Sequence, residues 1–274
     1  MIRIAKILIV AAAAGVVLYL VFMRVELSLK QRAAALQRDS ALPPASIGIP
    51  PGRASALYPA QIGIAPVRAS ALPLNCRLGE KIVYEIKMGK LTVGESVFEN
   101  LGRSSLAGKD AVRVVFQTRL PRFSDTETIY ADAASFLPLR VERDVAMWPK
   151  HEQIVEEYDQ QAFRLTITSH KGKTSVIEKE QPMHNAILLP YQVRCFATLE
   201  PGWRMPVNLP TQTFEITLKR VEDVRVPAGV FSAYYFESVP ERFAIWVSAD
   251  ERRLPVKIKG SGGIGYTMVM KSFE

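Results

Sequence analysis

The stretch KIVYEIKMGKLTVGESVFE, at Lys81–Glu99, decides the fold because it contains two strands and the turn between them. In each half, apolar residues alternate with polar ones, which is the period of a strand that buries one face. Gly89 lies between the halves and supplies the positive φ that a tight turn needs. The stretch therefore predicts an antiparallel β-hairpin.

The same alternation continues to the C-terminus, with turns spaced about 8–12 residues apart, as in consecutive hairpins. A second glycine turn is predicted at Gly172, in SHKGKTS. The predicted strands are Lys81–Met88, Leu91–Glu99, Ala111–Thr118, Thr126–Ala131, Leu137–Asp144, His151–Tyr158, Ala162–His170, Thr174–Lys179, Thr213–Val221, Val230–Val239, Arg242–Ser248, Leu254–Lys259 and Ile264–Phe273.

Only His184–Leu199 has apolar residues at helical spacing, and Pro190 is expected to bend or split a helix there. One helix against a large antiparallel sheet can cover an open concave face. The fold prediction is therefore mainly β: a large curved antiparallel sheet or unclosed barrel with one covering helix, preceded by an N-terminal transmembrane helix.

The transmembrane prediction rests on Ile7–Met23, an uninterrupted apolar run between Lys6 and Arg24. The two basic side chains can snorkel to the membrane surfaces. A cleaved signal peptide is the alternative, but the small-residue stretch Arg32–Leu36 lies well beyond the apolar run, which favours an uncleaved anchor. We expect a single-pass protein of the inner (cytoplasmic) membrane, with its N-terminus in the cytoplasm and its body in the periplasm.

Three segments follow from this organisation. Residues 1–38 form a membrane anchor and charged helical collar, 39–75 a proline-rich repeated linker, and 76–274 a β-rich domain. The linker contains two similar copies, Ser40–Arg53 and Ser55–Arg68. They are interpreted as a spacer, with a pair of docking peptides as the alternative.

The net charge of +8 is concentrated near the N-terminus. Eight basic and two acidic residues precede Cys76, which leaves 27 basic and 25 acidic residues for the rest of the chain. A nucleic-acid-binding domain would concentrate Lys and Arg on the domain itself. The sequence therefore gives no indication of a nucleic-acid partner.

No motif indicates catalysis. Gly260–Gly265 spells G-x-G-x-x-G, but a dinucleotide site needs a following helix, and the remaining residues predict a strand. The three histidines lack ligand spacing, and there is no G-x-S-x-G. The acidic residues Glu156, Glu157 and Asp159 are placed on an exposed strand face. The sequence predicts no enzyme, no cofactor and no metal site.

Cys76 and Cys195 are the two cysteines of the chain. Outside the cytoplasm such a pair often forms a disulfide, which here would join the start of the domain to the predicted helix. Two unrelated thiols are the alternative.

Five phrases, in order, resemble the bacterial domain-of-unknown-function 3108 family over about residues 78–273. They are LGEKIVYEIKMGKLTVGE (Leu78–Glu95), ETIYADAASFLPLRVE (Glu127–Glu142), YQVR (Tyr191–Arg194), VRVPAGVFSAYYFE (Val224–Glu237) and IWVSADERRLPVKIK (Ile245–Lys259). The resemblance implies an exported envelope protein and, by analogy, the unclosed barrel of lipoprotein carriers. It brings no catalytic residues.

Three functions are compatible with these observations. The first is a membrane-anchored binding module whose concave face holds a lipid or other apolar ligand. Its candidate lining residues are Trp246, Tyr234, Phe236 and Phe116, for which packing in the core is the alternative role. The second is an envelope scaffold that meets a protein partner without a small ligand. The third is a hydrolase, which would need acids or histidines with perturbed pKa values in a polar site.

Overall fold

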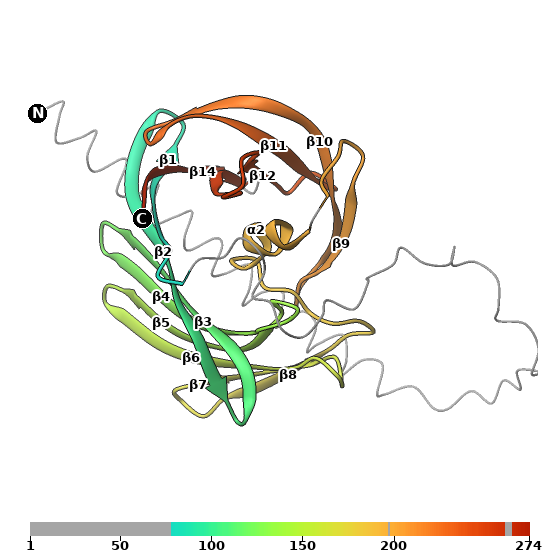
Figure 1. Ribbon diagram of the computed structural model, residues 1–274. Helices are drawn as coiled ribbons and strands as arrows, with labels where there is room; N and C mark the ends of the chain where they lie inside the picture. Colours follow the sequence, from blue (N-terminus) through green and yellow to red (C-terminus); the bar gives the residue numbers. More distant parts are fainter. Residues whose placement is uncertain (1–77, 197, 261–264) are drawn as a thin grey trace, which may run out of the picture. The chain divides into compact units, whose positions relative to one another are not determined.

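A computed structural model describes residues 78–274, except 197 and 261–264 (Figure 1). The predicted membrane helix, the collar, the linker and Cys76 lie outside the described residues. Within the described part of the chain, no helix is long and apolar enough to cross a membrane.

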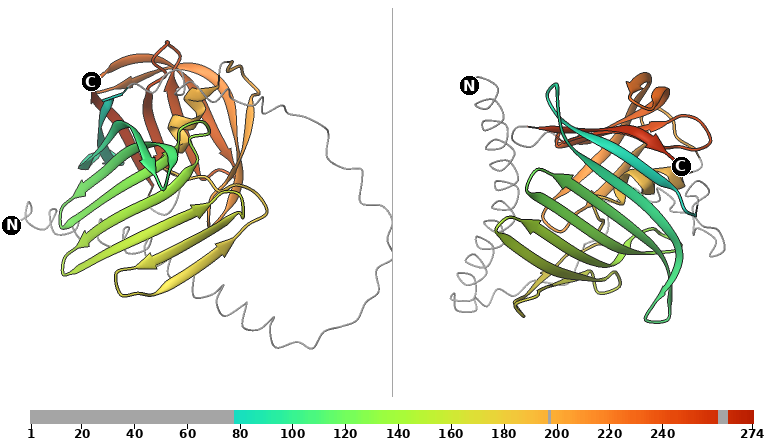
Figure 2. Two further views of the ribbon diagram at one scale, coloured as in Figure 1. Left: turned by 60° about the horizontal axis from the view of Figure 1, so that its bottom comes forward. Right: turned by 90° about the vertical axis from the view of Figure 1, so that its left-hand side faces the viewer.

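The described residues form one antiparallel sheet of 14 strands, in the order β8-β7-β6-β5-β4-β3-β2-β1-β14-β13-β12-β11-β10-β9. The strands are β1 Lys81–Met88, β2 Leu91–Leu106, β3 Lys109–Leu120, β4 Phe123–Asp132, β5 Pro138–Met147, β6 Lys150–Asp159, β7 Arg164–Ser169, β8 Thr174–Glu178, β9 Arg204–Asn208, β10 Thr213–Val226, β11 Gly229–Val239, β12 Phe243–Ser248, β13 Pro255–Gly260 and β14 Tyr266–Phe273. The sheet curves, and β8 and β9 are its edges (Figure 2). A mainly β, unclosed antiparallel sheet is thus confirmed.

The first hairpin has the predicted geometry. In β1, buried residues alternate with partly exposed ones, so Ile82, Tyr84 and Ile86 share one buried face. Gly89 has φ +60° in the turn between β1 and β2, and Gly172 has φ +73° in the turn between β7 and β8. Both glycine turns are therefore confirmed.

The helix is shorter than predicted. Among the described residues of His184–Leu199, only α2 (Leu189–Gln192) and the 3₁₀ turn η1 (Val193–Cys195) are helical. Pro190 lies in the first turn of α2, where its missing N–H removes no helical hydrogen bond, so it neither bends nor splits the helix.

Helix α2 lies inside the curve of the sheet (Figure 1). Tyr191 stacks on Phe98 of β2, with ring centroids 3.5 Å apart, while Leu189 and Val193 belong to a core cluster with residues of β10–β12. The inner face of the sheet is therefore the one that carries Tyr84 and Phe98. Opposite sides of the helix therefore pack on two parts of the curved sheet, which we call its arms: β1–β8 and β9–β14.

The first glycine of the G-x-G-x-x-G stretch, Gly260, leaves room for the ring of Tyr266. Gly260 ends β13, and a Cβ there would lie 2.6 Å from Cε1 of the Tyr266 ring. Tyr266–Phe273 forms the terminal strand β14, as predicted, so no helix follows the glycines to face a pyrophosphate.

Candidate functional site

Trp246 lies on the outer face of the sheet. It is paired with Tyr235, whereas its neighbours Ile245 and Val247 pack with α2 on the inner face. The indole Nε1 donates to Glu222 Oε1 at 2.7 Å. Although the side chain is buried, it does not point toward the space between the arms.

The other three predicted lining residues lie on the inner face, two of them in one core cluster and the third at the other. Phe236 is fully buried in the cluster that includes Leu189, and Tyr234 is half-buried against the same cluster. Phe116 lies on β3, half-buried against the other core cluster. Trp246 is a member of that cluster too, so the four residues are divided between two clusters and form no single lining.

Four charged residues gather on the inner face of β4–β6, and we call them the inner-face cluster: Asp125, Glu127, Arg143 and Glu156. Their position follows from the strand register. Glu127 is paired with Arg143, and Asp125 and Glu156 are in phase with them on their strands.

Arg143 is the centre of the inner-face cluster. Its Nε lies 3.0 and 3.1 Å from the two carboxylate oxygens of Asp125, to which its terminal nitrogen also donates. The same Nε lies 3.6 Å from Glu127 Oε1. Tyr158 donates its hydroxyl proton to Glu156 Oε2 at 2.6 Å. One guanidinium is thus surrounded by three carboxyl groups.

Burial sets the protonation of the cluster. It raises the pKa of Glu127 to about 8, against the opposing effect of Arg143 and with help from the charges of Asp125 and Glu156. Burial also raises the pKa of Glu156, although the Tyr158 hydroxyl and Arg143 act in the opposite direction. For Arg143, burial lowers the pKa, but the hydrogen bond to Asp125 and the charge of Glu127 outweigh it and raise the pKa overall.

A protonated Glu127 donates a hydrogen bond, while Asp125 and Arg143 offer a charged pair to a polar group. This pattern suits recognition of a polar headgroup and is also one that acid–base catalysts use. Among the residues that the structure describes, no three His, Cys, Asp or Glu side chains are placed to hold a metal ion.

The protonation of Glu127 leads to a pH prediction. Its pKa is higher in the folded protein than in the unfolded chain, so the folded state binds more protons between about pH 4.5 and 8, and stability falls as the pH rises through this window. Glu127→Gln is expected to flatten this decline and to stabilise the protein at pH 8. Urea unfolding at pH 5 and pH 8 measures the effect. An unchanged pH dependence would contradict the assignment.

The sequence interpretation missed this cluster. It placed Glu156 with Glu157 and Asp159 on an exposed face, which is wrong for Glu156: Glu157 and Asp159 are exposed, but Glu156 is half-buried beside Tyr158. The alternation of faces along the strand could have predicted this position, because Glu156 faces the same side as the buried Tyr158, two residues later.

Cys195 ends η1, and its Sγ lies 3.6 Å from the carbonyl oxygen of Tyr191. Because Cys76 lies outside the described residues, the Cys76–Cys195 disulfide stays a prediction.

Comparison with known proteins gives one family match. The model described as "Protein of unknown function (DUF3108)" matches residues 83–271. No curated protein matches the sequence.

Several solved structures are similar to the chain. A β-barrel-like protein of domain of unknown function DUF1849 from Brucella abortus is 9% identical, with a TM-score of 0.43, and the alignment covers 72% of this chain and 98% of that one. A predicted lipoprotein from Parabacteroides distasonis is 10% identical, with a TM-score of 0.27 and coverages of 74% and 98%. A predicted exported protein with a YmcC-like fold from Bacteroides fragilis is 10% identical, with a TM-score of 0.26 and coverages of 72% and 96%. TM-scores below 0.5 at such identities establish neither a shared site nor a shared function.

Proposed function

The chain belongs to the DUF3108 family of proteins of unknown function, and we propose that it is a membrane-anchored extracytoplasmic binding module. The inner face of β3–β7 holds an amphiphilic ligand such as a lipid, whose apolar part contacts aliphatic and aromatic side chains and whose polar group meets the inner-face cluster.

One observation carries this proposal: a charged pair lies between two apolar side chains in a row across neighbouring strands, on a face that remains half-buried. Phe116, Glu127, Arg143 and Ile154 are successive register partners across β3–β6, and all four are half-buried. Sites for small ligands typically combine an apolar lining with a few placed polar groups. This row of side chains supplies both.

The cellular location in the proposal depends on the N-terminal sequence. The apolar run Ile7–Met23 has the composition of a membrane segment, and the proline-rich residues that follow give the β domain reach from its anchor. An exported domain of this kind is placed to take up or present a lipid near the membrane.

Ile154→Gln is expected to lower the amount of bound lipid about fivefold, because it replaces a half-buried apolar contact with an amide. Full-length protein is purified from its membrane, and the lipid bound per protein is measured by native mass spectrometry and by extraction. Val155→Gln is the matched control, because Val155 is the next residue and is also half-buried, but points to the outer face. Wild-type protein without bound lipid, or equal loss in both variants, contradicts the proposal and favours a scaffold without a small ligand.

A further inference from the structure

One end of the β1–β8 arm consists of four hairpin turns. Consecutive antiparallel strands place alternate turns at the same end, so the turns after β1, β3, β5 and β7 lie together. Figure 2 (left) shows the turns of the green and yellow strands along one border of the arm. The turns after β2, β4 and β6 lie at the other end.

The first set of turns is basic without exception, and we call it the basic rim: Lys87–Leu91, Arg119–Phe123, Met147–His151 and His170–Lys173. It contains seven Lys or Arg and no Asp or Glu; the basic residues are Lys87, Lys90, Arg119, Arg122, Lys150, Lys171 and Lys173. Lys87 pairs with Glu85 at 3.3 Å, while the other six form no ion pair within the described part of the chain.

The opposite end of the same strands has the opposite charge. Its turns and the end of β8, Leu106–Asp110, Asp132–Phe136, Asp159–Phe163 and Glu178–Glu180, contain five acidic and two basic residues. The arm is therefore electrically polar along its strands, and the basic residues are gathered at one end rather than scattered over the surface.

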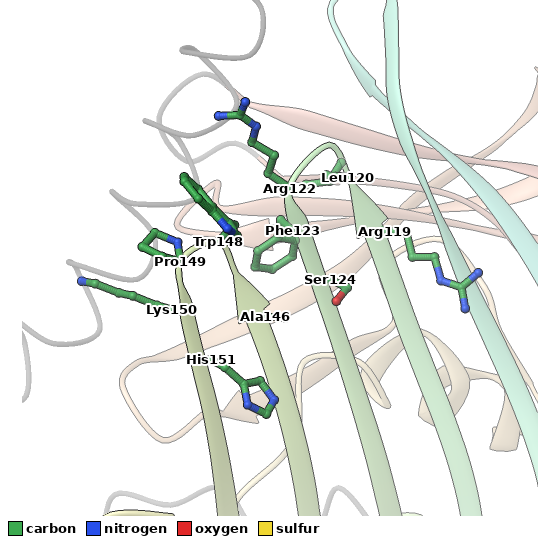
Figure 3. A pocket seen from close by; sticks show the side chains of 10 residues that line it. All are labelled: Arg119, Leu120, Arg122, Phe123, Ser124, Ala146, Trp148, Pro149, Lys150 and His151. Carbon is green, nitrogen blue, oxygen red and sulfur yellow. The ribbon is translucent and has the colours of Figure 1, made fainter.

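A pocket of about 550 Å³ opens at the centre of the basic rim, between the β3–β4 and β5–β6 turns (Figure 3). Arg119, Arg122, Lys150 and His151 line it, and none of the described lining residues is acidic. His151 bonds to Asp144 on the outer face at 2.8 Å, whereas Arg119, Arg122 and Lys150 form no ion pair within the described part of the chain.

Trp148 stands at the mouth of this pocket. It is 76% exposed, and the guanidinium carbon of Arg122 lies 5.8 Å from the centroid of its ring. Leu91, in the neighbouring β1–β2 turn, is 55% exposed. An exposed indole surrounded by cations is the combination that membrane–water interfaces favour: the indole enters the headgroup layer while Lys and Arg meet lipid phosphates.

We propose that the basic rim binds the surface of an anionic phospholipid bilayer, with Trp148 inserted at the headgroup level and a lipid phosphate in the pocket between Arg122 and Lys150. Contact at the rim makes the strands of this arm point away from the membrane surface, with the acidic end farthest from it. The inference does not require a ligand on the inner face.

Tryptophan quenching by bromine-labelled lipid tests the inference. Full-length protein is reconstituted into vesicles of phosphatidylcholine alone or with about 30% phosphatidylglycerol, a charge density at which each Lys or Arg near the surface attracts measurably. Because a membrane anchor acts in both compositions, only the difference between them reports on the rim. We expect phosphatidylglycerol to increase quenching, about 0.5 M salt to reverse the increase, and Trp148→Phe to abolish it.

Two lysine variants distinguish binding through the basic rim from attraction by the net charge of the protein. Lys150→Gln is expected to reduce the phosphatidylglycerol-dependent part about fivefold, whereas Lys109→Gln, a lysine in a turn at the opposite end, leaves it unchanged. Equal quenching in both vesicle types overturns the inference, as does an equal loss in the two variants. Inorganic phosphate at constant ionic strength should not compete; competition would assign the pocket to a soluble anion and overturn the bilayer contact.

Discussion

Arg194→Met is expected to lower the free energy of unfolding by about 3–5 kcal/mol, because it leaves the carboxylate of Glu80 buried without its counter-charge. The Arg194 side chain is inaccessible to solvent, and that of Glu80 is 5% exposed. The two terminal nitrogens of the guanidinium lie 2.5 and 2.8 Å from the two oxygens of Glu80, in a bidentate pair. One of them also donates to the carbonyl of Arg252 at 3.0 Å. The side chain thus joins η1 to the residue before β1 and to the turn before β13.

Urea unfolding of Arg194→Met and of Glu80→Gln/Arg194→Met measures the effect. The double variant should regain part of the loss, because it removes the unpaired charge as well as the pair. Arg140→Met is the control: Arg140 pairs with the exposed Glu157 at 2.9 Å, and such surface pairs contribute about 0–1 kcal/mol. A loss for Arg194→Met no larger than for Arg140→Met would contradict the prediction.

The strands could be predicted where the alternation is unbroken, as in β1, whose bounds match. Where a bulge shifts the register, the prediction stopped early. The strand predicted to end at Glu99 continues as β2 to Leu106, past an irregularity between Asn100 and Gly102. A bulge adds a residue to one strand, so the apolar side chains beyond it no longer follow the alternation of those before it. The remaining part of the strand is then not recognised from the sequence.

Strand β9, Arg204–Asn208, was missed for another reason. It contains Pro206, and proline donates no hydrogen bond to a ladder, so a strand is not expected there from the sequence. The structure places β9 at the edge of the sheet, where Pro206 is paired with Glu215 on β10. An edge strand has no second partner strand, so the missing N–H of proline is tolerated there. Whether a strand lies at an edge depends on the order of all the strands, which local sequence does not contain.

For the candidate site, the alternation of faces along each strand is a better guide than the type of residue. Large aromatic residues were chosen as the ligand lining, but the register puts Trp246 on the outer face. Conversely, the charged residues Glu127 and Arg143 were not among the candidates, although Glu127 has the same strand phase as the buried Ile129, and Arg143 the same phase as the buried Val141. Following the phase through charged positions would have found the pair; their mutual contact depends on the pairing of β4 with β5.

The fold also depends on a single aromatic residue of α2, and Tyr191→Ala is expected to lower the free energy of unfolding by about 3–5 kcal/mol. The ring of Tyr191 is nearly parallel to that of Phe98 on β2, at an interplanar angle of 10°. Its hydroxyl lies 3.2 Å from that of Tyr84 on β1, which itself donates to the carbonyl of Pro255 on β13 at 2.9 Å. Tyr191 therefore donates to Tyr84, and removing its ring opens a cavity where the helix meets β1 and β2.

Tyr191→Phe separates the ring from the hydroxyl. It keeps the stack on Phe98 and removes one buried hydrogen bond, so we expect a loss of about 1 kcal/mol by urea unfolding. Tyr84→Phe should cost more than Tyr191→Phe, because it removes both the acceptor for Tyr191 and the donor to Pro255, and leaves two buried polar groups without this partner. Similar losses for Tyr191→Ala and Tyr191→Phe would contradict this account, because they would show that the ring of Tyr191 contributes little to holding the helix inside the sheet.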